Sequence, residues 1–187
     1  MRSLPLRIEL IQRLVSFVRD RRGISAVEFA MLLPLMVTMY LGVVEVSQGV
    51  AIDRKVTLTT RTMADLASRV SSINNSDMSN LLNASAAVIA PYQASPLRIV
   101  LSAVSIDANG VAKVAWSDTL GGTARTVGAT VTLPTALNVA NTQLIWSEVS
   151  YNYNPTFGYV LTGNINLSDQ LYMRPRLSDA ITRVNSG

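Results

Sequence analysis

The sequence contains no cysteine and no histidine among its 187 residues. The missing cysteine excludes disulfides, thiolate chemistry and zinc sites of the usual nitrogen and sulfur kind. The missing histidine removes the commonest general base and metal ligand, and with them any histidine-based catalytic triad. Catalysis would have to rest on carboxylates, serines or lysines, so we expect no enzymatic activity, no metal and no cofactor.

A carboxylate-based hydrolase is the enzymatic alternative. Its candidate acidic residues do not cluster in the sequence, and no nucleophile lies in a recognisable turn. These candidates are Asp107, Asp118, Glu148 and Asp169. The sequence therefore gives little support to a hydrolase.

Charged residues are also scarce, at 15% of the chain against about 25% in an average soluble protein. Six arginines and two acidic residues lie in residues 1–23, which leaves ten basic and ten acidic residues in 24–187. The net charge of +4 therefore belongs to the N-terminal segment, and we expect no nucleic-acid binding. Arg19, Arg21 and Arg22 instead fit the positive-inside rule, which keeps the arginine-flanked end of a membrane span in the cytoplasm.

A long apolar run follows these arginines. Residues 24–52 contain only two charged side chains, Glu28 and Glu45. Because a helix needs about 20 apolar residues to cross a bilayer, we predict a transmembrane helix over 24–52, which Pro34 kinks modestly. The buried core helix of a soluble protein is the alternative. Upstream, residues 4–18 form either an amphipathic helix on the inner membrane face or part of a leader that is removed.

The helical pattern continues past the predicted span, over residues 53–73. Apolar and small residues recur there at alternating spacings of four and three, while charged residues occupy the other faces. The positions of this stripe are Ile52, Val56, Thr59, Met63, Leu66 and Val70. We expect the stripe to pack against the globular domain of the same chain, and a coiled coil between subunits is the alternative.

Residues 74–187 read as a globular domain of the α+β class. A short helix is predicted over 77–89, capped by Ser76 or Asp77, and Asn109-Gly110 is a strong hairpin signal. Strands are predicted over 97–107, 111–117, 126–133 and 144–153, with an edge strand over 167–176. A single sheet must bury one face, so we expect this small antiparallel sheet to pack on the extramembrane half of the long N-terminal helix.

Gly23 and Glu28 stand at the start of the apolar run. A signal peptide has its small cleavage-site residue after the apolar run, whereas Gly23 precedes it. A cut after Gly23 would remove the basic leader 1–23, retain the helix, and give Ile24 a free, positively charged α-amino group.

The carboxylate of Glu28 lies one helical turn from that amine. A charge at the centre of a membrane helix costs about 2.5–3.5 kcal/mol on insertion scales, so it needs a partner or a purpose. Glu28 could neutralise the amine of its own chain or that of a neighbouring subunit, which would set the register between helices. Alternatively it extends to the lipid headgroups, which is what we expect of Glu45 at the other end of the span.

Two sets of motifs carry a family resemblance. Residues 21–30, followed by Leu32-Leu33-Pro34 and by residues 42–45, resemble the N-terminal signature of the TadE-like pilus assembly proteins, pseudopilins of the tight-adherence (Flp, type IVc) pilus system. A weaker similarity lies in residues 149–155, with their Tyr-x-Tyr-x-Pro pattern, followed by Arg-Pro-Arg at 174–176.

The resemblance implies a pilin-like fold and a set of functional residues. Gly23 would precede the scissile bond, Ile24 would become the new N-terminus, and Glu28, followed by Phe29, would be the acidic residue needed for processing and assembly. The protein would then be a substrate of the prepilin peptidase, a membrane aspartic peptidase.

The resemblance also implies a location and partners. The chain would lie in the bacterial inner membrane with its C-terminal domain in the periplasm, or become part of an extracellular pilus. Its partners would be other pseudopilins, the major Flp pilin and the pilus assembly platform. An uncleaved bitopic protein with a membrane-anchored periplasmic binding or adhesion domain is the alternative function.

Overall fold

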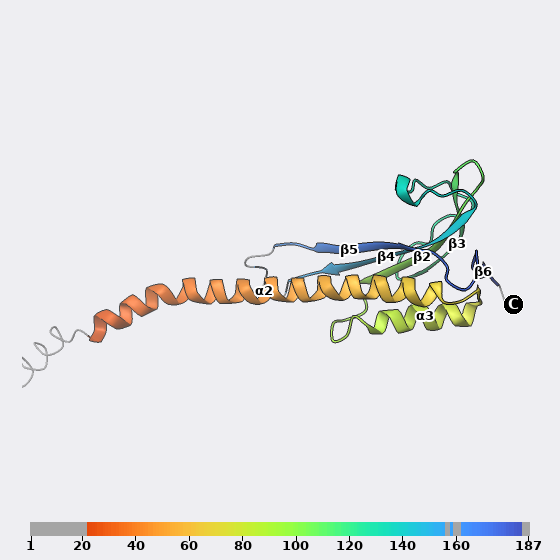
Figure 1. Ribbon diagram of the computed structural model, residues 1–187. Helices are drawn as coiled ribbons and strands as arrows, with labels where there is room; N and C mark the ends of the chain where they lie inside the picture. Colours follow the sequence, from red (N-terminus) through yellow and green to blue (C-terminus); the bar gives the residue numbers. More distant parts are fainter. Residues whose placement is uncertain (1–21, 156–157, 159–161, 185–187) are drawn as a thin grey trace, which may run out of the picture. The chain divides into compact units, whose positions relative to one another are not determined.

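The computed structural model describes residues 22–155, 158 and 162–184. The predictions for Arg19, Arg21 and residues 4–18, and those for the side chain of Arg22, fall outside this description. The chain divides into two compact units, Met1–Val44 and Glu45–Gly187. Helix α2, Arg22–Ser68, is assigned without a break across the boundary (Figure 1).

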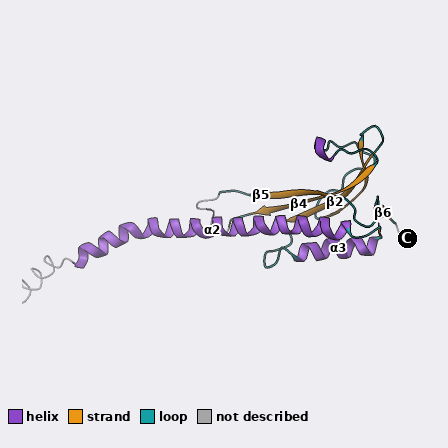
Figure 2. Ribbon diagram, in the orientation of Figure 1, coloured by secondary structure: helices purple, strands orange, loops and turns teal. Residues whose placement is uncertain are grey.

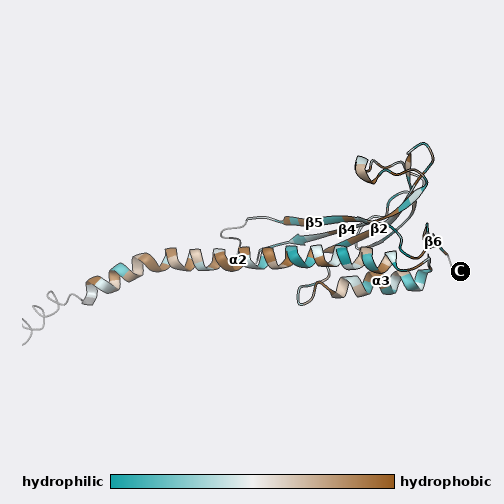
Figure 3. Ribbon diagram, viewed as in Figure 1, coloured by the Kyte–Doolittle hydropathy of each residue, from teal (hydrophilic) through white to brown (hydrophobic). Residues whose placement is uncertain are grey.

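The described part of the first unit is the N-terminal half of α2. All of its side chains from residue 23 to residue 40 are exposed, and Figure 3 shows this half mainly in brown and white. The helix continues through Pro34, whose carbonyl accepts a 2.8 Å hydrogen bond from the hydroxyl of Thr38. One helix among the described residues, Gly23–Ser68, is long and apolar enough to cross a membrane, by length and composition. Only 6% of its most apolar window is buried, unlike the core helix of a soluble protein.

The second unit is built around a four-stranded antiparallel sheet in the order β3-β2-β4-β5 (Figure 1). The strands are β2 (Leu97–Ile106), β3 (Ala112–Leu120), β4 (Thr142–Tyr153) and β5 (Ile165–Met173). The short elements are α3 (Asn75–Ala87), the 3-10 helix η1 (Thr135–Leu137), and the parallel pair β1 (Ser72–Ile73) and β6 (Thr182–Arg183). The predicted α+β class and small antiparallel sheet are confirmed.

Two helices cover one face of this sheet. Figures 1 and 2 show α3 and the part of α2 from Glu45 onward on the same side of the strands. Side chains from both helices and from β2 and β4 form one buried cluster. The predicted packing of the helical stripe on the chain's own domain is confirmed for its first four members, which are at most 3% exposed: Ile52, Val56, Thr59 and Met63.

The stripe departs from its predicted course near the end of α2. Leu66 is 38% exposed, and Ala67 is fully buried in its place. An α-helix has 3.6 residues per turn, so a repeat of 3.5 drifts by about 20° in each heptad. A straight helix therefore turns the fifth predicted position away from the sheet.

The predicted hairpin and short helix are present with adjusted boundaries. At the hairpin, Gly110 has a φ of 79°, and the Asp107 amide donates to the Val111 carbonyl at 3.1 Å. Helix α3 is capped by Asn74, whose Oδ1 accepts a 2.8 Å hydrogen bond from the Asp77 amide. The prediction of Ser76 or Asp77 as the cap was therefore wrong by two to three positions.

The predicted strand over 126–133 is wrong. The segment forms one isolated bridge with β3, between Lys113 and Thr130, and Gly128 interrupts it with a φ of 82°. The segment instead lies beside β3, with main-chain hydrogen bonds to Ala112 and Val114. Its last part packs against a second apolar cluster that includes Val104 and Trp146. Val131 and Leu133 are partly buried against this cluster, whereas Val127 is 63% exposed, so only the end of the apolar alternation reflects burial.

Candidate functional site

Four of the predicted site residues lie close together on the described N-terminal part of α2. Gly23 lies in open space, with nothing within 4 Å of the position of a β-carbon. Ile24 and Phe29 are 59% and 58% exposed. Glu28 is also exposed and lies four residues after Ile24, so their side chains share one face of the helix.

No ion pair or hydrogen bond within the described residues holds the Glu28 carboxylate. The carboxylate therefore stands on an apolar, uncovered stretch of helix. Isolated charges of this kind in a membrane helix mark functional positions by default.

The peptide bond between Gly23 and Ile24 lies on an exposed stretch of helix. Gly23 is exposed, and nothing lies within 4 Å of the position of a β-carbon there. Glycine also favours the helix less than alanine does, by about 1 kcal/mol. The helix is therefore less stable at this residue than it would be with alanine.

Glu45 is buried, which overturns the prediction that it extends to the lipid headgroups. Its exposed fraction is 1%, and its Oε1 accepts a 2.6 Å hydrogen bond from the Gly158 amide. Its main-chain carbonyl accepts another from the hydroxyl of Tyr153 at 3.1 Å. The sequence could not show this because both partners lie more than a hundred residues away.

The ring of Tyr153 also fits against Gly49. A β-carbon at Gly49 would lie 3.4 Å from Cε1 of this ring. Burial raises the pKa of Tyr153 above its ordinary value, and the negative charge of Glu45 and the nearby Tyr92 raise it further. We call Glu45, Gly49, Tyr153 and Gly158 the Glu45 junction. It gives the second tyrosine of the Tyr-x-Tyr-x-Pro pattern a structural role.

The Arg-Pro-Arg motif fastens the C-terminal segment to the end of α2. The Arg176 amide donates to the carbonyl of Ser68 at 2.9 Å, which supplies a partner to the last helical turn. The guanidinium of Arg176 lies 3.0 Å from the Asp65 carboxylate, which also pairs with Arg69 at 2.7 Å. Arg176, the last residue of the motif, therefore caps the C-terminus of α2 although it is far from this helix in the sequence.

A few residues farther on, Ile181 is held by side chains that the sequence did not single out. Its carbonyl accepts a 2.8 Å hydrogen bond from Nε1 of Trp116, and its amide donates to Oε1 of Gln143 at 2.6 Å. Next to it, Arg183 makes a two-point contact with the carboxylate of Asp118 at 2.9 and 3.0 Å. Nothing in the local sequence around Trp116 or Gln143 indicates these long-range contacts.

The four acidic residues of the hydrolase alternative lie in separate local contacts. Asp118 pairs with an arginine as described, and Glu148 pairs with Arg125 at 2.7 Å. Asp107 accepts hydrogen bonds from amides of its own hairpin, and Asp169 accepts one from the next residue. Within the described part of the chain, no group of three or more acidic side chains could hold a metal ion.

These features first define a class of protein. A long N-terminal helix with an uncovered apolar half, one short helix and a four-stranded antiparallel sheet make a pilin-like α+β layout. A protein-family model described as TadE-like protein matches residues 23–65, and the predicted resemblance is confirmed over that segment. This similarity to TadE-like proteins lies within helix α2. Comparisons with curated proteins and with solved structures find no match.

Proposed function

We propose that the protein is a minor pseudopilin that supports assembly of a tight-adherence (Flp) type IV pilus. One observation carries the proposal: Gly23, Ile24, Glu28 and Phe29 lie close together on an exposed, apolar stretch of helix. This is also the start of the TadE-like segment. The role is that of an assembly subunit, not of an enzyme.

In this proposal, the prepilin peptidase cuts the chain after Gly23. The exposure of Gly23 and the open space around it support this step, because a peptidase must reach the scissile bond. The cut removes the excess positive charge of residues 1–23 and leaves ten basic and ten acidic residues. The retained helix anchors the product in the inner membrane, with the second unit in the periplasm.

After the cut, the carboxylate of Glu28 forms an ion pair in the mature helix. Its carboxylate balances the new amine of Ile24, either in the same chain or in a neighbouring subunit. In an apolar environment such a pair sets the axial position of one helix against the next. The neighbours would be other pseudopilins and the major Flp pilin, brought together at the pilus assembly platform.

The N-terminus of the mature protein tests the processing step. We expect intact-mass analysis of the membrane-extracted protein to show a chain that begins at Ile24. We expect Gly23→Leu to block the cut, since a bulky side chain would stand next to the scissile bond. A wild-type chain that still begins at Met1 would overturn the proposal and favour an uncleaved, membrane-anchored binding domain.

The assembly role of Glu28 requires a separate test. We expect Glu28→Ala to reduce pilus formation at least tenfold while the thermal unfolding of the second unit stays unchanged, because Glu28 lies outside that unit. Asp53→Ala is the matched control, since it removes an exposed carboxylate from the same helix beyond the apolar run. Normal pilus numbers with Glu28→Ala would contradict the pairing role.

A further inference from the structure

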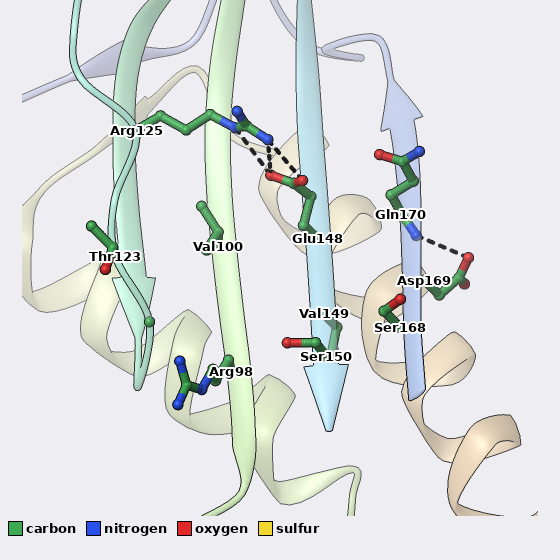
Figure 4. A pocket seen from close by; sticks show the side chains of 11 residues that line it. Arg98, Val100, Thr123, Arg125, Glu148, Val149, Ser150, Ser168, Asp169 and Gln170 are labelled. Carbon is green, nitrogen blue, oxygen red and sulfur yellow. Dashed lines mark hydrogen bonds and ion pairs between the residues drawn. The ribbon is translucent and has the colours of Figure 1, made fainter. Parts of the chain in front are cut away.

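The face of the sheet that points away from α2 and α3 carries an open groove (Figure 4). Its volume is about 660 Å³, within the range of about 300–1,000 Å³ that is usual for small-ligand sites. Residues of β2, β4 and β5 line it, together with the segment that follows β3. A second hollow of about 300 Å³ adjoins it, and Arg98 and Ser150 line both.

The segment that follows β3 forms one wall of the groove and is fixed by several contacts of Arg125. The guanidinium of Arg125 makes hydrogen bonds of 2.7 to 3.0 Å with both carboxylate oxygens of Glu148 and lies 3.7 Å from the ring centroid of Trp146. Its amide donates to Oγ of Ser117 at 3.0 Å. At Gly122, a β-carbon would lie only 3.0 Å from Oγ1 of Thr119, so this glycine lets the wall approach the sheet. The charges of Arg125 and Glu148 are thus satisfied by each other.

Arg98 differs from Arg125 because its charge is not neutralised. Its side chain is exposed, and no residue in the described part of the chain makes an ion pair or hydrogen bond with its guanidinium. Figure 4 shows it at the end of the groove opposite to the Arg125–Glu148 pair. The groove therefore offers one available cation.

The groups beside Arg98 in the sheet are uncharged and can form hydrogen bonds. Asp169 also lines the groove, but Figure 4 shows its carboxylate on the side of β5 that is turned away from Arg98. In the sheet register, Arg98 pairs with Ser150, which pairs with Ser168. This row spans three strands at spacings of about 4.8 Å. Two residues farther along β4, Asn152 pairs with Asn166 of β5. Both asparagines line the second hollow.

We infer that this groove binds an acidic saccharide, with the carboxylate of a uronic acid unit on Arg98. A guanidinium binds a carboxylate through two parallel hydrogen bonds. Serine hydroxyls and asparagine amides each donate and accept, as do the hydroxyl groups of a sugar ring. A nucleic acid or polyphosphate would need several available cations along its path, and the groove offers one. An acidic peptide would place apolar side chains on a floor that is mainly polar.

Calorimetric titration of the full-length protein in detergent tests the inference. The probes are a trimer of galacturonic acid, the corresponding neutral galactose trimer and a triglutamate peptide. We expect the acidic trimer to bind at least tenfold more tightly than either of the other two. We also expect its affinity to fall as salt is raised, because Arg98 is exposed.

The matched variants are Arg98→Gln and Arg61→Gln, each of which removes one exposed arginine of the second unit. We expect Arg98→Gln to weaken binding of the acidic trimer at least tenfold and Arg61→Gln to leave it unchanged, with both variants unfolding at the wild-type temperature. Equal affinity of Arg98→Gln and wild type, equal affinity for the neutral trimer, tighter binding of triglutamate, or no binding at all would each overturn the inference. None of these readouts depends on cleavage after Gly23.

Discussion

The hydroxyl group of Tyr153 donates a 3.1 Å hydrogen bond to the main-chain carbonyl of Glu45, 108 residues earlier in the chain. Glu45 is the first residue of the second unit, and Tyr153 is the last residue of β4. This contact therefore ties the end of a central strand to the point on α2 where the globular unit begins.

We expect Tyr153→Phe to lower the free energy of unfolding of the second unit by about 0.5–1.5 kcal/mol, the usual contribution of one hydrogen bond. The ring that packs against Gly49 stays in place, so the change isolates the hydroxyl. Urea unfolding of the full-length protein in detergent, followed by tryptophan fluorescence, measures it. Tyr151→Phe is the control, since the Tyr151 ring is also buried but its hydroxyl has no hydrogen bond to any described residue. An equal loss in both variants would contradict the role given to this contact.

Ser147 provides a prediction of the opposite sign. Its Oγ is buried and has no hydrogen-bond partner among the described residues, and an unsatisfied buried polar group is destabilising by about 1–3 kcal/mol. We expect Ser147→Ala to leave the free energy of unfolding unchanged or to raise it by about 1 kcal/mol. Ser102→Ala should lower it, because Oγ of Ser102 lies 2.9 Å from Oγ of Ser117. Chemical unfolding compares the two variants, and a clear destabilisation by Ser147→Ala would show that its hydroxyl is satisfied in solution.

The sequence predicts elements whose signals are local. The hairpin follows from Asn109-Gly110, and β4 follows from its run of β-branched and aromatic residues, because neither needs information from elsewhere in the chain. The long apolar helix is predicted for the same reason, from the uninterrupted apolar run after Gly23.

Long-range contacts account for the predictions that were wrong. Glu45 resembles a headgroup-level carboxylate until the chain brings Tyr153 and Gly158 to it. The segment 126–133 has the alternation of a strand, but the positive φ of Gly128 limits its pairing with β3 to one isolated bridge. The side chains of Trp116 and Gln143 make hydrogen bonds with the main chain of Ile181. No pattern in the sequence near any of these residues predicts these bonds.

We expect Ile181→Ala to destabilise the second unit by about 2–5 kcal/mol, because Ile181 is 1% exposed and its truncation leaves a cavity. Loss of this anchor should also make the C-terminal segment sensitive to limited proteolysis. Leu177→Ala is the control within the same segment, since Leu177 is 71% exposed and should be replaceable at no measurable loss. Wild-type stability and protease resistance in Ile181→Ala would contradict the anchoring role.

The tyrosines make stability depend on pH in the alkaline range. Burial is the main cause that raises the pKa values of Tyr151, Tyr153 and Tyr172 in the folded protein, whereas the unfolded chain titrates near 10. Below about pH 10 both states keep these protons. Above it the unfolded state loses them first, so the free energy of unfolding falls as pH rises toward the pKa values of the folded state.

Tyrosinate absorbance during an alkaline titration checks this prediction. We expect part of the signal to appear only above the range in which ordinary tyrosines titrate, and Tyr153→Phe should remove a share of that late part. The unfolding temperature measured in parallel should fall over the same pH interval. A single titration step near pH 10 for every tyrosine would contradict the prediction.

The exposed half of α2 could pass from lipid to contact with other helices without disturbing the globular unit. Among the described residues, every side chain of the buried apolar core lies at or beyond Ile52, and the stretch 23–40 is exposed along its whole length. Exchange of lipid for the helices of other subunits would leave that core as it is. Because lipid tails are as apolar as leucine, the hydrophobic effect favours neither environment. In the proposed assembly, the preference of this half of α2 for other helices over lipid would therefore depend on close packing and on the pairing of the Glu28 carboxylate.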